Sequence, residues 1–169
     1  MIFGECVYGY GAYSADMLWV HWWDYYLKGG SIMRSLDQYI SHFTRPNSHQ
    51  LNEDGTTFRS NILLLNGDVL PKAPYFTITW YCSPGDPKTD THTHDFDEYL
   101  GFAGSDPNDP SNLNGLVRFM IDDEWVTIDK STILFIPAGV KHCPYVIERV
   151  DKPIIHWSGG NSGSYEQLR

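Results

Sequence analysis

Cysteine is scarce in this chain of 169 residues, and its three cysteines, Cys6, Cys82 and Cys143, lie far apart. They form no Cys-x-x-Cys pair, and an odd number cannot pair completely within one chain. These features exclude a disulfide framework and a four-cysteine zinc site. We therefore expect free thiols in the reducing environment of the cytoplasm.

Positive charge and long apolar runs are also lacking. Lysine and arginine number 12 against 21 aspartates and glutamates, which gives a net charge of −9, and basic residues form no block. Such an acidic surface repels a phosphate backbone, which excludes nucleic acid as a partner. No apolar run approaches the roughly 20 residues that cross a bilayer, and no basic residue precedes Lys28, so no secretory signal is visible. The sequence predicts a cytoplasmic protein that binds neither nucleic acid nor membranes.

The residues that are present favour one globular domain with an N-terminal extension. Hydrophobic residues make up 41% of the chain and aromatic residues 15%, which suffices for a sizeable core at this length. Helices are predicted over 15–28 and 32–43, each preceded by a serine that can act as N-cap. The first of these runs is rich in aromatic residues and would also suit a strand. We expect residues 1–60, with a polar loop from Arg45 to Ser60, to pack on the main domain or on a partner subunit.

From residue 61 onward, short apolar or alternating runs are separated by residues that favour turns. The predicted strands cover residues 62–65, 75–82, 98–102, 116–121, 125–128, 133–136, 145–147 and 154–157, with residues 91–94 also extended. Many short strands at near-regular spacing are typical of a β-sandwich or β-barrel. The sequence therefore predicts an all-β barrel over residues 61–169, following the extension over residues 1–60.

Three histidines and one glutamate have an informative spacing. His92 and His94 are one residue apart, so on a strand their imidazoles share one face. Glu98 follows after a possible tight turn, and we expect it to begin the adjacent antiparallel strand beside these imidazoles. His142 follows another strand and a turn that contains proline and glycine. Imidazoles with one carboxylate suit Fe, Mn, Co, Ni, Cu or Zn, whereas Ca and Mg prefer oxygen ligands.

The pattern His92-x-His94-x-x-x-Glu98, followed by Pro-x-Gly-x-x-His142, resembles the two signature motifs of the cupin superfamily. The resemblance implies a cupin-like jelly-roll β-barrel. It also implies that His92, His94, Glu98 and His142 bind one divalent transition metal ion. Four ligands leave up to two positions of an octahedral ion for water, substrate or dioxygen. The sequence departs from the family pattern around the motifs and not at the ligands.

Two further residues are candidates for the chemistry itself. His156 lies in a predicted strand that we expect to return beside the strand of His142. Facing inward, His156 would act as a general acid/base or bind a substrate carboxylate; facing outward, or hydrogen-bonded in the core, it would be structural. Arg118 stands alone in an apolar strand. Inside the barrel it would bind a substrate carboxylate, and on the solvent face it would be structural.

These residues favour a mononuclear metalloenzyme that acts on a small organic substrate coordinating through oxygen. The cupin resemblance implies dioxygenase, isomerase, decarboxylase, lyase or hydrolase chemistry without choosing among them, and it suggests a homodimer. The alternative is a non-catalytic cupin module that binds a small molecule or a metal ion. An enzyme would lose turnover but keep its fold in the Glu98→Gln variant, whereas a binding module would form no metal-dependent product.

Overall fold

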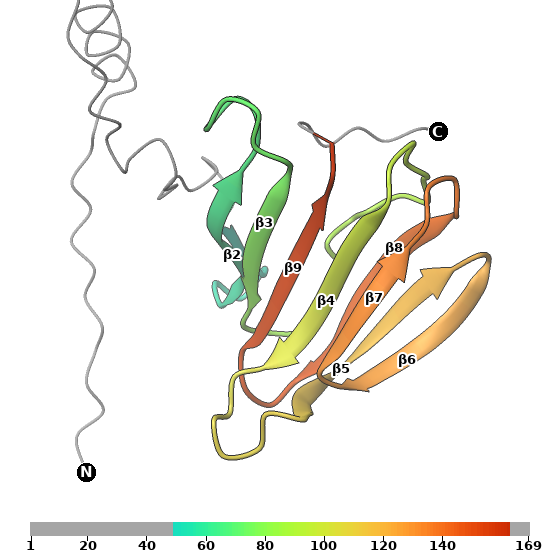
Figure 1. The fold of residues 1–169 in the computed structure, drawn as a ribbon. Coiled ribbons are helices and arrows are strands. Elements are labelled where there is room, and N and C mark those ends of the chain that lie inside the picture. The colour runs from blue at the N-terminus through green and yellow to red at the C-terminus, as the bar shows by residue number, and fades with distance from the viewer. Residues whose placement is uncertain (1–48, 163–169) are drawn as a thin grey trace, which may run out of the picture. The chain divides into compact units, whose positions relative to one another are not determined.

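The computed structural model describes residues 49–162, which form two antiparallel β-sheets facing each other (Figure 1). Within this range one sheet has six strands in the order β1-β2-β3-β9-β4-β7, and the other has three in the order β6-β5-β8. The strands are β1 (Gln50–Leu51), β2 (Thr57–Leu65), β3 (Phe76–Tyr81), β4 (Glu98–Gly104), β5 (Asn112–Ile121), β6 (Glu124–Lys130), β7 (Thr132–Ile136), β8 (His142–Val150) and β9 (Ile154–Gly160).

The predicted all-β architecture is confirmed, with one correction near its start. The polar stretch from Arg45 to Ser60 was expected to be a loop, but its described part contains β1 and the first residues of β2. Arg59 pairs with Tyr81 of β3, and Gln50 of β1 pairs with Arg59. Strands near the edge of a sheet tolerate polar residues, because part of their surface faces solvent.

Neither predicted helix, over 15–28 or over 32–43, falls among the described residues. A search of the described residues for a helix of membrane-spanning length and hydropathy finds none.

The core lies between the two sheets because alternate residues of each strand point inward. On β4, Leu100 and Phe102 are buried, and on β5 so are Val117 and Phe119. The rings of Phe102 and Phe119 meet edge to face across the interior, with centroids 6.3 Å apart. Burial of each such side chain contributes roughly 1.5–3 kcal/mol, so this core holds the two sheets in a defined relation.

The segment from Gly85 to His92 lies along the free edge of β8. Gly85 and Ile147 exchange backbone hydrogen bonds of 2.9 Å, and His92 and His142 exchange bonds of 3.1 Å. The segment therefore extends the three-stranded sheet beyond β8. It also carries the first predicted metal-binding motif to the beginning of the strand that holds the second.

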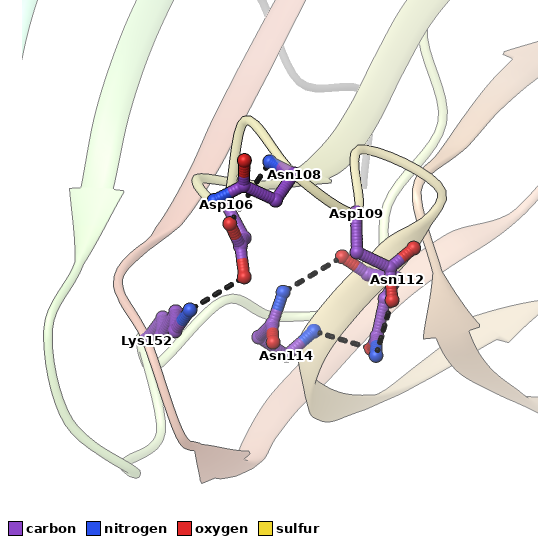
Figure 2. Close-up of polar contacts among 6 residues, drawn as sticks. All are labelled: Asp106, Asn108, Asp109, Asn112, Asn114 and Lys152. Carbon is purple, nitrogen blue, oxygen red and sulfur yellow. Dashed lines mark hydrogen bonds and ion pairs between the residues drawn. The ribbon is translucent and has the colours of Figure 1, made fainter.

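The loop between β4 and β5 is held by its own polar side chains, as Figure 2 shows. The Asp106 carboxylate accepts hydrogen bonds from the backbone N–H of Asn108, at 3.0 Å, and from Lys152 Nζ, at 2.5 Å. The Asn112 amide donates to Asp109 at 3.2 Å. Lys152 lies in the turn between β8 and β9, so its contact with Asp106 joins the β4–β5 loop to that turn.

Candidate metal centre

His92 and His142 are placed side by side by their paired backbones. Their imidazole centroids are 4.4 Å apart, and the His94 ring lies 4.9 Å from the first and 5.1 Å from the second. His94 also stacks on Phe96, with centroids 4.6 Å apart. The structure thus brings the three predicted histidine ligands together at one end of the three-stranded sheet.

Glu98 approaches these histidines from the other sheet, which corrects the sequence-based expectation. It begins β4, whose hydrogen-bonded neighbours are β7 and β9, not the segment that carries His92. The turn over residues 95–97 therefore crosses from one sheet to the other. Asp97 accepts a hydrogen bond from the backbone N–H of Ala138 at 3.0 Å, and the Gly139 N–H donates to the His94 carbonyl at 2.8 Å. These bonds connect the two motifs directly.

The ligand atoms of His94, Glu98 and His142 all lie within 4.8 Å of one another. Glu98 Oε2 is 3.0 Å from His142 Nε2 and 3.7 Å from His94 Nε2. The three side chains are 1–3% exposed. We call this group the His94–Glu98–His142 cluster.

The tautomer of His142 shows that the cluster fits a cation. Its Nδ1 lies 3.0 Å from the carbonyl oxygen of Val140, which only accepts hydrogen bonds, so Nδ1 carries the proton. In the neutral ring Nε2 is then a bare acceptor facing the Glu98 carboxylate, and this buried nitrogen has no hydrogen-bond partner. Two acceptors held 3.0 Å apart away from water are stabilised by a positive charge between them, which either a proton on Nε2 or a metal ion supplies.

His92 is held in the form that binds metals. Its Nδ1 lies 2.7 Å from the Asp90 carbonyl, and burial lowers the pKa of His92, which favours the neutral ring. The ligand atoms of His92 group with those of His142 and Cys143 rather than with Glu98. Burial, with a contribution from the negative charge of Glu98, raises the pKa of the Cys143 thiol to about 12, so this thiol stays protonated at neutral pH.

Tyr75 is a contact of the cluster that the sequence did not reveal. Its buried hydroxyl donates to Glu98 Oε1 at 3.4 Å, on the carboxylate oxygen opposite the one that faces the histidines. Tyr75 lies just before β3 and is 23 residues from Glu98. Nothing in its local pattern distinguishes it from an ordinary aromatic residue at the beginning of a strand.

Comparisons with known proteins bear on the fold. No family model matches the sequence, and no curated protein matches it. Among solved structures, Peruvianin-I, a cysteine peptidase from Thevetia peruviana latex, is 13% identical, with 80% of this chain and 79% of that chain covered and a TM-score of 0.51. KdgF from Halomonas sp. is 12% identical, with coverage of 73% and 94% and a TM-score of 0.41. FeII HppE is 11% identical, with coverage of 79% and 62% and a TM-score of 0.44.

The chain has a cupin-like fold of two facing antiparallel β-sheets, and the likeness to Peruvianin-I agrees with it at the level of the fold. At such low identity the likeness shows the fold alone.

Within the cupin barrel, His156 faces inward but does not join the cluster. Its strand, β9, lies between β3 and β4, so the expected position beside the strand of His142 is wrong. His156 pairs with Phe102 and Glu98 pairs with Gly160, which places the two residues four positions apart along β4, or roughly 13 Å.

The surroundings of His156 are those of a buried, hydrogen-bonded core residue. Its Nδ1 lies 2.9 Å from the Gly101 carbonyl oxygen, and its ring stacks on Phe102 with centroids 4.5 Å apart. Burial lowers the pKa of His156 to about 4. These contacts favour the core interpretation over a general acid/base at the cluster.

Arg118 lies on the outer face of the barrel, which decides between its two alternatives and excludes the interior role of binding a substrate carboxylate. Its neighbours Val117 and Phe119 point inward, and alternation along β5 therefore turns Arg118 outward. Its side chain is 45% exposed, pairs with Glu148 through Nε and lies over the Trp125 ring, 5.0 Å from the centroid. The solvent-face alternative describes this residue.

Proposed function

We propose that the chain binds one divalent transition metal ion through the His94–Glu98–His142 cluster, with His92 as the fourth ligand, and uses this ion in an enzymatic reaction. The observation that carries the proposal is the pair of acceptors, His142 Nε2 and Glu98 Oε2, that face each other 3.0 Å apart in a buried site. Imidazoles with one carboxylate suit Fe, Mn, Co, Ni, Cu or Zn. The substrate is a small organic molecule that coordinates through oxygen.

The residues around the cluster prepare it for an ion. The Val140 and Asp90 carbonyls accept hydrogen bonds from Nδ1 of His142 and His92. The Nε2 atoms of both rings therefore point away from the backbone. Tyr75 holds the remaining oxygen of Glu98. When bound, the ion would supply a Lewis acid or a redox centre. These contacts do not choose among dioxygenase, isomerase, decarboxylase, lyase and hydrolase chemistry, and we place these reaction classes on an equal footing.

The alternative is a non-catalytic module that holds a metal ion or a small molecule. One observation favours it: the cluster side chains are only 1–3% exposed, as in closed structural metal sites. A catalytic site needs a position that substrate can reach.

Metal analysis of the full-length protein tests the proposal. Protein purified without added ions, and protein reconstituted in turn with Fe(II), Mn(II), Ni(II) and Zn(II), is expected to hold about one ion per chain. In the Glu98→Gln variant the affinity should fall by more than the 10- to 100-fold that loss of an outer partner costs. Glu124→Gln, at an exposed position of β6, is the matched control and should bind metal like the wild type.

The outcomes separate the two functions. A wild-type protein that holds no ion after every reconstitution would refute the metal site. If the ion is present, the loaded protein is incubated with a panel of small oxo and hydroxy acids and the products are analysed by mass spectrometry. Product that forms in the Glu124→Gln variant but not in Glu98→Gln supports the enzyme, whereas metal without any product supports the binding module.

A further inference from the structure

Arg59 is an arginine on the inner face of the barrel. It lies directly opposite Tyr81 in the register between β2 and β3, and paired residues project to the same face of a sheet. Tyr81 is 1% exposed and belongs to the core between the sheets. The Arg59 side chain is half-buried, and its Nε is inaccessible to solvent.

Arg59 differs from the other arginines of residues 49–162 in having no acidic partner. Arg118 pairs with Glu148, and Arg149 pairs with Asp151 at 3.0 Å, both on the exposed surface. Arg59 forms no ion pair with any described residue; its guanidinium hydrogen-bonds Tyr81, but its buried Nε has no hydrogen-bond partner. A guanidinium cannot lose its proton in a protein, so a buried Nε–H without an acceptor is costly. The chain carries a net charge of −9, yet no described carboxylate pairs with this inward-facing arginine.

Two tyrosine hydroxyls extend this polar region across the interior. Tyr81 on one sheet and Tyr145 on the other meet with their oxygens 2.6 Å apart. One hydroxyl donates to the other, so the second hydroxyl retains a proton for another acceptor. Burial raises the pKa of both phenols, which keeps them protonated, while the Arg59 guanidinium nearby acts in the opposite direction. The His156 ring lies 5.9 Å from the Tyr81 ring and 5.5 Å from the Tyr145 ring.

We propose that Arg59, with the hydroxyl pair of Tyr81 and Tyr145, binds the carboxylate of a small organic acid inside the barrel. The guanidinium fork matches the two oxygens of a carboxylate, and the carboxylate supplies the negative charge that Arg59 lacks. The spare phenolic proton provides a third donor. Arg59 thus takes the role that the sequence suggested for Arg118.

This inference goes beyond the proposed function. Through Tyr81 and Ile154, Arg59 is level with Gly104, six positions from Glu98 along β4, or roughly 20 Å, so a small acid held there would not reach the cluster. Carboxylate binding at Arg59 requires no metal. The test therefore uses metal-free, full-length protein, in which an acid cannot bind through the ion. Acetate, butyrate and benzoate serve as probes, and acetamide, butyramide and benzamide are their neutral counterparts.

Binding is measured by titration while the Arg59 Nε–H signal is followed by nuclear magnetic resonance of protein labelled with ¹⁵N-arginine. At least one acid should bind and shift this signal, and its amide should not. The Arg59→Gln variant should bind that acid about tenfold or more weakly, in line with the loss of charged hydrogen bonds. Arg118→Gln removes an arginine from the outer face and should bind within twofold of the wild type.

Three results would overturn the proposal: no acid binds, acid and amide bind alike, or Arg59→Gln binds as well as Arg118→Gln. If circular dichroism shows that Arg59→Gln is unfolded, Arg59→Lys replaces it. That variant keeps the charge but lacks the fork and should bind more weakly than the wild type, so equal binding would also overturn the proposal. Metal content is measured in parallel on reconstituted samples of the same variants and of Glu98→Gln, and only Glu98→Gln should lose metal. A failure at Arg59 is thereby distinguished from a failure of the metal site.

Discussion

The buried His156 should make the stability of the metal-free protein depend on pH in a specific window. Its folded-state pKa is about 4, whereas an unfolded histidine titrates near 6.5. Between these values the unfolded chain binds a proton that the folded chain does not. The free energy of unfolding therefore falls as the pH is lowered from 6.5 towards 4, and the loss is complete below pH 4.

The magnitude follows from the two pKa values. Between pH 7 and pH 4.5, His156 should remove about 2.5 kcal/mol of the free energy of unfolding. The perturbation is His156→Gln, which keeps an N–H donor for the Gly101 carbonyl but does not titrate. Urea unfolding of metal-free protein is measured at both pH values. The wild type should lose about 2.5 kcal/mol more than the variant over this interval.

The comparison cancels other titrating groups, including His92, because both proteins contain them. His49→Gln replaces an exposed histidine and should keep the pH dependence of the wild type. Equal pH dependence in wild type and His156→Gln would refute the reasoning, since it would mean that His156 is not held neutral by burial.

Three further predictions concern the centre, the fold and the assembly. Tyr75→Phe removes the hydroxyl that holds Glu98 and should weaken metal binding by about tenfold in competition with a chelating dye; unchanged affinity would show that this contact is not needed. Gly104→Ala would place a methyl group against the backbone carbonyl of Asn112, which cannot move freely, and should lower the free energy of unfolding in urea by about 1–3 kcal/mol; wild-type stability would argue against this packing. The homodimer stays a prediction from the cupin resemblance, and sedimentation velocity of the full chain checks it, with a species of monomer mass as the contrary result.

The strands could be predicted because most of them have one buried and one exposed face. On β3, Thr79 and Tyr81 are buried and Trp80 between them is less so, as the alternation of side chains requires. The grouping of the four residues of the two motifs could also be predicted, from the cupin resemblance and, for His92 and His94, because a strand places residues two apart on one face. The crossing of the turn over residues 95–97 to the other sheet could not.

The pairing of distant strands could not be predicted from these local patterns. Ile154 to Trp157 would suit any apolar neighbour, so nothing local places β9 between β3 and β4. The error for His156 follows from that. Strand register likewise decides which arginine faces inward, since a shift of one residue would exchange the two faces. Arg59 follows a polar run that resembles a loop, whereas Arg118 lies between apolar residues, so the local pattern favours Arg118 as the candidate.

The origin of Glu98 and His142 in different sheets has a mechanical consequence. An ion held between them would cross-link the two sheets at one end of the sandwich, where side-chain packing and the turn over residues 95–97 also connect them. At a free metal concentration 100 times the dissociation constant, such a cross-link would add about 2.7 kcal/mol to the stability of the folded state. In its absence the sheets should separate first at that end, and amide hydrogens of the first residues of β4 and β8 should exchange with solvent before those of the Phe102–Phe119 core. The state of the metal centre would then be readable in the exchange rates of backbone amides.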